Sequence, residues 1–120
     1  MTATANVVRW SDVEQEQLTP LIDRQFISTQ AVTLARFHLK KGSKVPEHHH
    51  VNEQMSYVVE GALHFVMPDK EVTVRSGEVL LIPAELPHSA EAREDCYVID
   101  IFTPHRKDWA DKNDAYLRGR

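Results

Sequence analysis

The chain has 120 residues, which is enough for one domain that buries roughly two-thirds of the surface its unfolded chain exposes, so we expect a single domain over residues 1–120. Its formal net charge of −4 argues against binding to nucleic acid or to a membrane surface. With one cysteine, no internal disulfide is possible, and no stretch has the apolar character of a signal peptide or a membrane span. The sequence therefore predicts a cytoplasmic protein.

Short β-type runs begin near residue 18 and are separated by turns that contain Gly, Pro or Asp. In chain order the runs cover residues 18–23, 30–39, 55–61, 62–67, 71–77, 78–83, 88–92 and 96–102. No 3.6-residue period occurs between residues 30 and 102, so the only expected helix is a short one in the tail, residues 105–120, anchored by Trp109. This pattern predicts an all-β barrel with its core at about residues 30–104.

Three consecutive histidines, at positions 48–50, stand just ahead of a predicted strand. Because side chains alternate along an extended strand, His48, His50 and Gln54 are expected on one face, with Glu53 on the outer face. Two histidines at positions i and i+2 form a natural pair for one metal ion, and Gln54 offers a carbonyl oxygen. His88, which follows a Pro-rich turn, is the candidate for a further ligand from another strand.

The last predicted strand carries an aspartate among apolar residues. Asp100 shares a strand face with Val98 and Phe102, and burying an unpaired carboxylate is costly. Asp100 is therefore expected to pair with a cation, such as Arg106 or a metal ion, or to line a water-filled cavity. Arg106 follows the bend at Pro104 and is expected to fold over the barrel mouth and to bind a carboxylate through two hydrogen bonds.

The spacing of these residues resembles the two motifs of the cupin family. The resemblance covers about residues 30–106, with fifteen residues between the motifs. The first motif is matched by Gly42, His48, His50, Gln54 and Gly61, and the second by Gly77, Pro83 and His88. The chain departs from the pattern at Gln54, Glu85 and Ala92, where Glu, Gly and Asn are usual.

For the fold and the metal, the resemblance implies a cupin barrel that holds one divalent ion per chain (Zn, Ni, Mn or Fe). Its ligands would be His48, His50, Gln54 and His88. Since free imidazole takes up a proton near pH 6.5, metal binding is expected to weaken below roughly that pH.

Three stretches resemble a particular group of cupins more closely: NEQMSYVVEGAL, LPHSAEAREDCYVIDIF and YVIDIFTPHRKDW. They are similar to the KdgF-like cupins, which ketonise 4,5-unsaturated uronates during pectin and alginate breakdown. In that group three His and one Gln hold the metal, and an Asp, a Phe and an Arg complete the active site. Those positions fall on Asp100, Phe102 and Arg106. A shell of three His and one Gln is neutral and leaves the full charge of +2 on the ion, which suits a small anionic sugar substrate.

Two other functions use the same residues. A three-His site also suits a cupin dioxygenase that holds Fe(II), Ni(II) or Cu(II), and the rate of such an enzyme would depend on dissolved oxygen. The third candidate is a barrel that binds a metal or a small molecule without turnover.

Apolar side chains on the outer strand faces predict a homodimer, because the barrel has no further core for them to fill. These residues are Tyr57, Val59, Tyr97, Ile99 and Ile101. The exchanged or edge-adding element is expected in the first strand, at residues 18–23 or 24–28.

Overall fold

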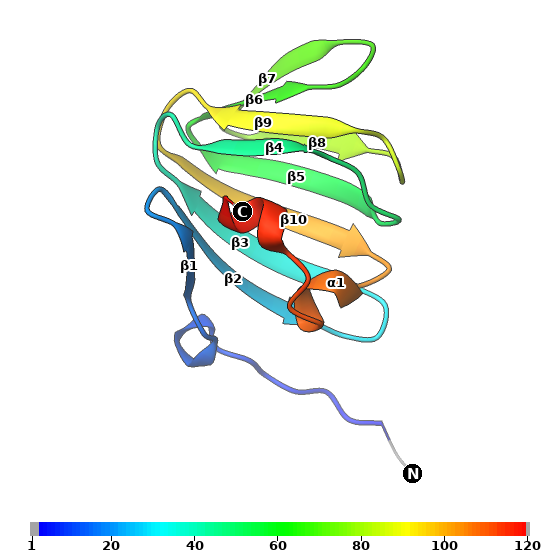
Figure 1. Ribbon diagram of the computed structural model, residues 1–120. Coiled ribbons are helices and arrows are strands. Elements are labelled where there is room, and N and C mark those ends of the chain that lie inside the picture. The colour runs from blue at the N-terminus through cyan, green and yellow to red at the C-terminus, as the bar shows by residue number, and fades with distance from the viewer. Residues whose placement is uncertain (1–2, 120) are drawn as a thin grey trace.

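The computed structural model describes residues 3–119, which form two antiparallel β-sheets and a short C-terminal tail (Figure 1). The six-stranded sheet has the order β1 (Glu16–Thr19), β2 (Ile22–Ser28), β3 (Thr33–Leu39), β10 (Cys96–Thr103), β5 (Glu53–Glu60) and β8 (Glu78–Ile82). The four-stranded sheet has the order β4 (Lys44–His48), β9 (His88–Ala92), β6 (Ala62–Val66) and β7 (Glu71–Arg75). The helical elements are η1 (Trp10–Asp12), α1 (Lys107–Ala110) and η2 (Ala115–Arg118). The predicted all-β class with a short C-terminal helix is confirmed.

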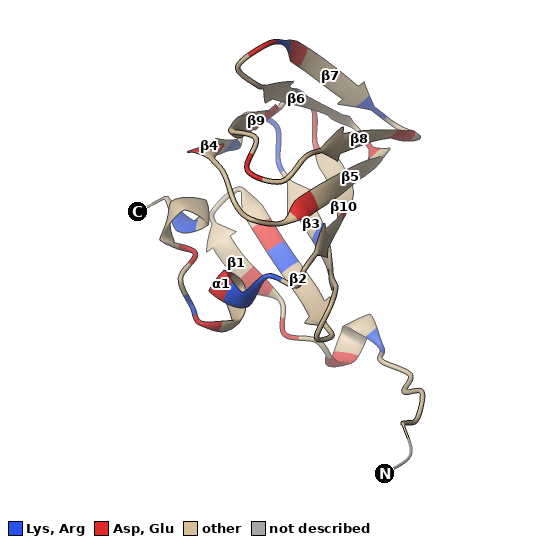
Figure 2. Ribbon diagram, turned by 90° about the vertical axis from the view of Figure 1, so that its right-hand side faces the viewer, with Lys and Arg blue, Asp and Glu red and all other residues tan. Residues whose placement is uncertain are grey.

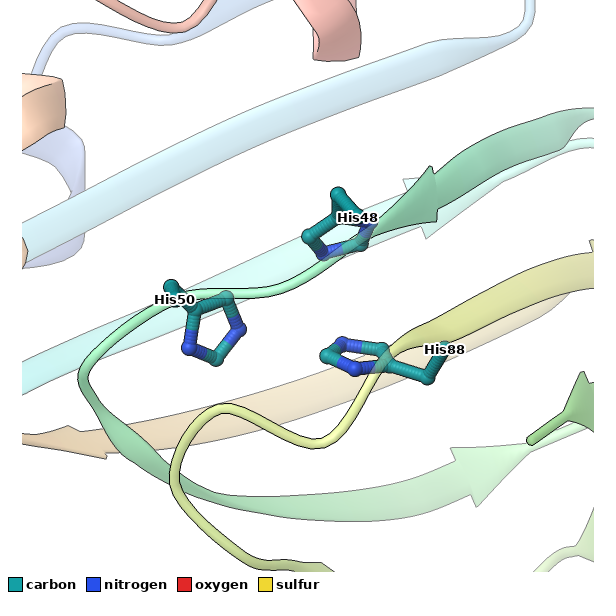
Figure 3. Close-up of side chains that lie close together, drawn as sticks. All are labelled: His48, His50 and His88. Atoms are coloured by element: carbon teal, nitrogen blue, oxygen red, sulfur yellow. The ribbon is translucent and has the colours of Figure 1, made fainter. Parts of the chain in front are cut away.

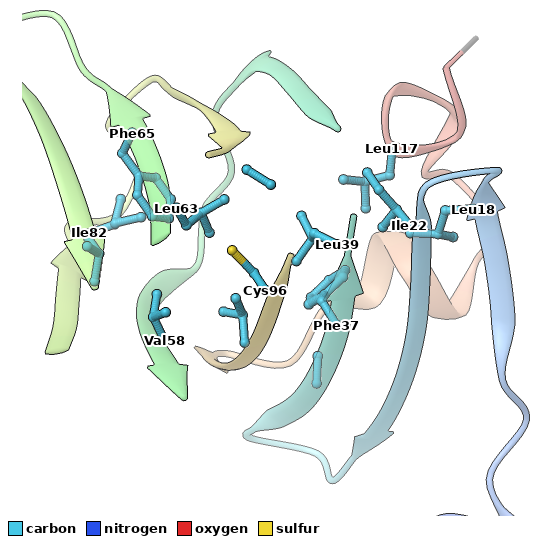
Figure 4. Packing of buried hydrophobic residues seen from close by; sticks show 14 of the residues in the cluster. Leu18, Ile22, Phe37, Leu39, Val58, Leu63, Phe65, Ile82, Cys96 and Leu117 are labelled. Carbon is cyan, nitrogen blue, oxygen red and sulfur yellow. The ribbon is translucent and has the colours of Figure 1, made fainter. Parts of the chain in front are cut away.

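Strict alternation of buried and solvent-facing side chains explains the central strands. On β10, Val98, Asp100 and Phe102 face inward, and on β5 every second residue from Gln54 to Val58 does the same. The inward side chains of both sheets form one apolar cluster between the sheets (Figure 4). Trp109 joins that cluster from the tail, as expected for an anchor.

The first predicted run is divided between two strands. The run 18–23 is not one strand, because Pro20 and Leu21 form the turn of a hairpin between β1 and β2. Proline suits a turn and has no N–H to donate to a β-ladder. Both hairpin strands belong to the six-stranded sheet, so this sheet starts at Glu16, two residues before the first predicted run.

The two open sides between the sheets are closed in different ways. On one side a short turn at Ser76 and Gly77 joins the edge strands β7 and β8. On the other side the edges are β1 and β4, and η2 contacts both of them. The C-terminal tail, which carries charges of both signs, therefore bridges the two sheets (Figure 2). Within the described residues, no helix is long and apolar enough to cross a membrane.

Candidate metal centre

Three histidines from separate parts of the chain converge between the sheets (Figure 3). His48 ends β4 and lies opposite His88 at the start of β9, and His50 lies in the connection between β4 and β5. One ring nitrogen from each histidine lies within 4.8 Å of the other two. This spacing is close enough for the three side chains to share one ion after small rotations.

The strand parity that predicted this pairing is not the physical reason for it. Residues 48 to 54 do not form one strand, because β4 ends at His48 and β5 begins at Glu53 in the other sheet. The turn between them brings the His50 ring back toward His48, with 5.5 Å between the ring centroids. Gln54 then enters the cavity from the second residue of β5, while Glu53 is exposed as expected.

Backbone carbonyl groups orient all three imidazole rings. The Nδ1 atoms of His48, His50 and His88 lie 2.8, 3.0 and 2.8 Å from the carbonyl oxygens of Pro46, Asn52 and Leu86. A carbonyl only accepts, so each Nδ1 carries the proton and each Nε2 keeps a lone pair. Such outer hydrogen bonds are typical of histidines that ligate metals. The Nε2 atom of His88 is buried and has no hydrogen-bond partner among the described residues.

Gln54 adds an oxygen to this group of nitrogens. Its amide N–H donates to Ser56 Oγ at 2.9 Å, which turns Oε1 toward the Nε2 atom of His50, 3.0 Å away. With a lone pair on each atom, the oxygen and the nitrogen face each other as two acceptors. A cation between them would satisfy both, so the donor set fits a divalent ion bound by three imidazoles and one amide.

Burial keeps the histidines neutral. Desolvation lowers the pKa of His48 to about 4, although the hydrogen bond to the carbonyl of Pro46 acts in the opposite direction. Desolvation and the charge of Arg106 lower the pKa of His50 to about 4 as well. Burial also lowers the pKa of His88. Neutral imidazoles are the form that binds metal ions, and His48 and His50 hold that form well below neutral pH.

Asp100 and Phe102 extend from β10 into the same cavity as His48 and His88. Only 8% of Asp100 is exposed, and its Oδ1 atom makes no hydrogen bond to any described residue. Burial raises the pKa of its carboxyl group to about 7, although Ser56 and Arg106 act in the opposite direction. Asp100 therefore lines a cavity, which is one of the placements expected for it.

Arg106 lies in the interior rather than over the mouth of the barrel. It is 1% exposed, and its guanidinium packs 4.7 Å from the ring centroid of Phe102 and 4.3 Å from that of Trp109. Its Nε and Nη2 atoms donate to the two carboxylate oxygens of Asp108, at 2.9 and 2.7 Å. Asp108 therefore occupies the edge of the Arg106 guanidinium that was expected to bind a substrate carboxylate through two hydrogen bonds.

Two further residues hold this site together, and sequence patterns did not single out a role for either. The side-chain amide of Asn52 donates to the carbonyl groups of Pro104 and His105, just before Arg106. Tyr116, from η2, lines the cavity beside His48. Both contacts join residues more than fifty positions apart, so no local spacing reveals them.

The chain also matches a known protein family. Residues 35–106 match the cupin domain. The chain belongs to the cupin family. The three-His cluster of this cupin points to a metal site, in line with the donor set described above.

Solved structures place this cupin among small single-barrel members of the family. KdgF from Halomonas sp. has a TM-score of 0.80 and 26% identity, covering 88% of this chain and 99% of that one. An RmlC-like cupin from Shewanella frigidimarina has a TM-score of 0.80 and 24% identity, covering 91% and 99%. An oxalate decarboxylase from Bacillus subtilis shares the fold at 18% identity and a TM-score of 0.77, covering 87% of this chain and 31% of its own. Comparison with curated proteins found no match.

Proposed function

We propose that this cupin is a metal-dependent enzyme that ketonises 4,5-unsaturated uronates. The observation that carries the proposal is the buried Asp100 carboxyl, with an unpartnered Oδ1, in one cavity with Gln54 and with His48 and His88 of the three-His cluster. Support also comes from the similarity to KdgF, which spans nearly the whole of both chains. The proposed metal ligands are His48, His50, Gln54 and His88.

The reaction needs one proton to move within the substrate. Ketonisation of the cyclic enol breaks the C1–O5 bond, forms the C1 aldehyde as the anomeric hydroxyl loses its proton, and places a proton on C4 as C5 becomes a ketone. The atoms balance without a co-reactant. A bound divalent ion would polarise substrate oxygens as a Lewis acid.

Asp100 is the proposed group that moves this proton. A carboxyl whose pKa lies at about 7 can exist in both protonation states at neutral pH. It can therefore accept a proton from the anomeric hydroxyl and return it to C4, which is the condition for general acid–base catalysis. Phe102 is the proposed wall of the pocket, and Arg106 supplies positive charge for the substrate carboxylate.

The test is turnover of an unsaturated uronate by metal-loaded wild-type protein and by Asp100→Asn. Because ketonisation removes the conjugation between the double bond and the carboxylate, loss of ultraviolet absorption measures the rate. We expect Asp100→Asn to lose about 10²–10⁴-fold in turnover. Metal content and melting temperature should stay at wild-type values.

Asp69→Asn, in the exposed β6–β7 turn, is the matched control and should keep full activity. Wild-type turnover by Asp100→Asn would remove Asp100 from the mechanism. A rate that rises with dissolved oxygen would instead favour a dioxygenase over the proposed isomerisation.

A further inference from the structure

The tail brings a tyrosine to the candidate metal centre. Tyr116, on η2, is half-buried and lines the cavity that contains His48 and Asp100. The centroid of its ring lies 4.7 Å from that of the His48 ring, with 33° between the ring planes. Its hydroxyl accepts a hydrogen bond from the Nη2 atom of Arg106 at 2.7 Å.

The hydrogen bonds around Arg106 leave two donors unused at this point. The Nε and Nη2 atoms of Arg106 donate hydrogen bonds to Asp108 and Tyr116. Its Nη1 atom makes no hydrogen bond to any described residue. Tyr116 uses its oxygen as an acceptor, so its own O–H remains without an acceptor among the described residues. Arg106 and Tyr116 both line the cavity and are joined by a hydrogen bond, and an Arg N–H together with a Tyr O–H suits a carboxylate.

We propose that Tyr116 is a substrate-binding residue which, together with Arg106, forms a two-donor seat for the carboxylate of a sugar acid. The carboxylate takes one hydrogen bond from the Arg106 Nη1 and one from the Tyr116 hydroxyl. The choice of a sugar acid as the ligand rests on the function proposed above. The seat itself rests on the two donors and on their place in the cavity wall.

The position of Tyr116 is held by an ionic cluster on the far side of η2. Arg118 donates to Glu16 at 2.7 Å and to Asp114 at 3.0 Å, and the buried Arg24 donates to the same two carboxylates at 2.9 and 2.8 Å. These bonds tie the residues on both sides of Tyr116 to β1 and β2. A side chain anchored in this way contacts a ligand at little further cost in conformational entropy.

The test measures binding and does not depend on turnover. Calorimetric titration of metal-loaded protein with D-galacturonate, which has a carboxylate, is compared with D-galactose, which has none. The variant is Tyr116→Phe, which keeps the ring against His48 and removes only the hydroxyl. Tyr57→Phe, on the exposed face of β5, is the matched control.

We expect Tyr116→Phe to bind galacturonate about 10- to 100-fold more weakly than wild type, the usual loss for a hydrogen bond to a charged group. The response to galactose, the metal content and the melting temperature should not change, and Tyr57→Phe should behave as wild type. Equal galacturonate affinity in Tyr116→Phe and wild type would overturn the proposal, as would no galacturonate binding by wild type. Failure of the ketonisation assay alone would leave this result standing.

Discussion

Burial of the site histidines changes the pH at which protons compete with a metal ion. An unperturbed imidazole has a pKa near 6.5, but desolvation lowers the values for His48 and His50 to about 4. Between pH 6.5 and 4 the unfolded chain therefore binds more protons than the folded one, so these residues make the metal-free protein less stable as the pH falls. The folded site, in contrast, keeps neutral ligands across the same window.

We predict that metal affinity stays nearly constant from pH 7 down to about pH 5, rather than weakening below pH 6.5. Competition with a chelator at a series of pH values measures this directly. The double variant His48→Ala/His50→Ala should bind no metal at any of these pH values, which ties the signal to the site. A steep loss of affinity that starts at pH 6.5 would show that the rings titrate as if exposed.

Glu85 adopts a backbone conformation that favours glycine. Its φ is 65°, and its N–H donates to the carbonyl of His50 at 2.8 Å. The strained turn therefore supports the metal loop, the connection between β4 and β5 that carries His50. The left-handed conformation costs a residue with a Cβ atom about 1–2 kcal/mol. A glycine at this position would avoid that cost and so gain stability. The greater flexibility of glycine in the unfolded chain would offset about 0.5–1 kcal/mol of this gain.

Glu85→Gly should therefore raise the free energy of unfolding by about 0.5–1 kcal/mol, measured by urea denaturation. The exposed contact of the Glu85 carboxylate with His49, at 3.3 Å, contributes little. Glu85→Ala is the matched control, because it removes that carboxylate and keeps the Cβ atom, and it should show no such gain. A lower urea midpoint for Glu85→Gly than for wild type would contradict the strain argument.

At the scale of elements, the ionic cluster of Glu16, Arg24, Asp114 and Arg118 decides how firmly the tail closes the cavity. Burial alone would raise the pKa of Glu16 and of Asp114, but the hydrogen bonds from the two arginines hold both values below their usual range. A carboxyl group whose pKa is lowered in the folded protein stabilises the fold at pH values above its pKa in the unfolded chain. This contribution is lost as the pH falls through the folded pKa. The tail is thus held most firmly near neutral pH.

The cavity beside the candidate metal ligands is small. Its water-accessible volume is ≈ 60 Å³, and a water molecule needs roughly 10–15 Å³ of such space. Trp109, Tyr116 and Leu117 form part of the cavity wall, so the position of the tail sets the space that is open to a ligand.

Arg118→Gln should make the tail open more often. The variant removes the hydrogen bonds to Glu16 and Asp114, while Arg24 still pairs with both. We expect faster amide hydrogen exchange over residues 107–118 than in wild type, with exchange in β5 and β10 unchanged. Lys107→Gln is the matched control, because its ion pair with Asp111 is exposed and contributes little. Equal exchange in all three proteins would mean that the cluster does not hold the tail.

Local patterns predicted the strands better than the tail and the metal loop. The strands from β5 to β10 follow from alternation and from turns such as Gly61, whose φ is 95° and where any Cβ would collide with the backbone of Asp95. The four ligand candidates followed from motif spacing, although the parity argument wrongly continued one strand through the turn after His48. The role of Tyr116 depends on tertiary contacts of the tail, which no spacing in the sequence encodes.

Taken as a whole, the molecule presents an apolar outer face on its six-stranded sheet. Cross-strand neighbours in the β-ladders form two adjacent rows that continue over β10, β5 and β8. The residues of the outer-face rows are Leu34, Ile101, Met55 and Leu81 in the first row, and Ile99, Tyr57 and Val79 in the second. Leu81 and Val79 are 66% and 51% exposed. An apolar sheet face of this kind packs well against an identical face, because aligned sheets interdigitate their side chains.

We propose that two copies of the chain pair through these outer-face rows. Light scattering at micromolar concentration should give a mass of twice the 13.8 kDa of one chain. The double variant Met55→Lys/Leu81→Lys should be monomeric, since it would place four like charges in a symmetric interface. Val66→Lys, at a 41% exposed position on the four-stranded sheet, is the matched control and should remain dimeric. A wild-type mass near 13.8 kDa would rule out the pairing. A double variant that stays dimeric would place the interface on another face of the molecule.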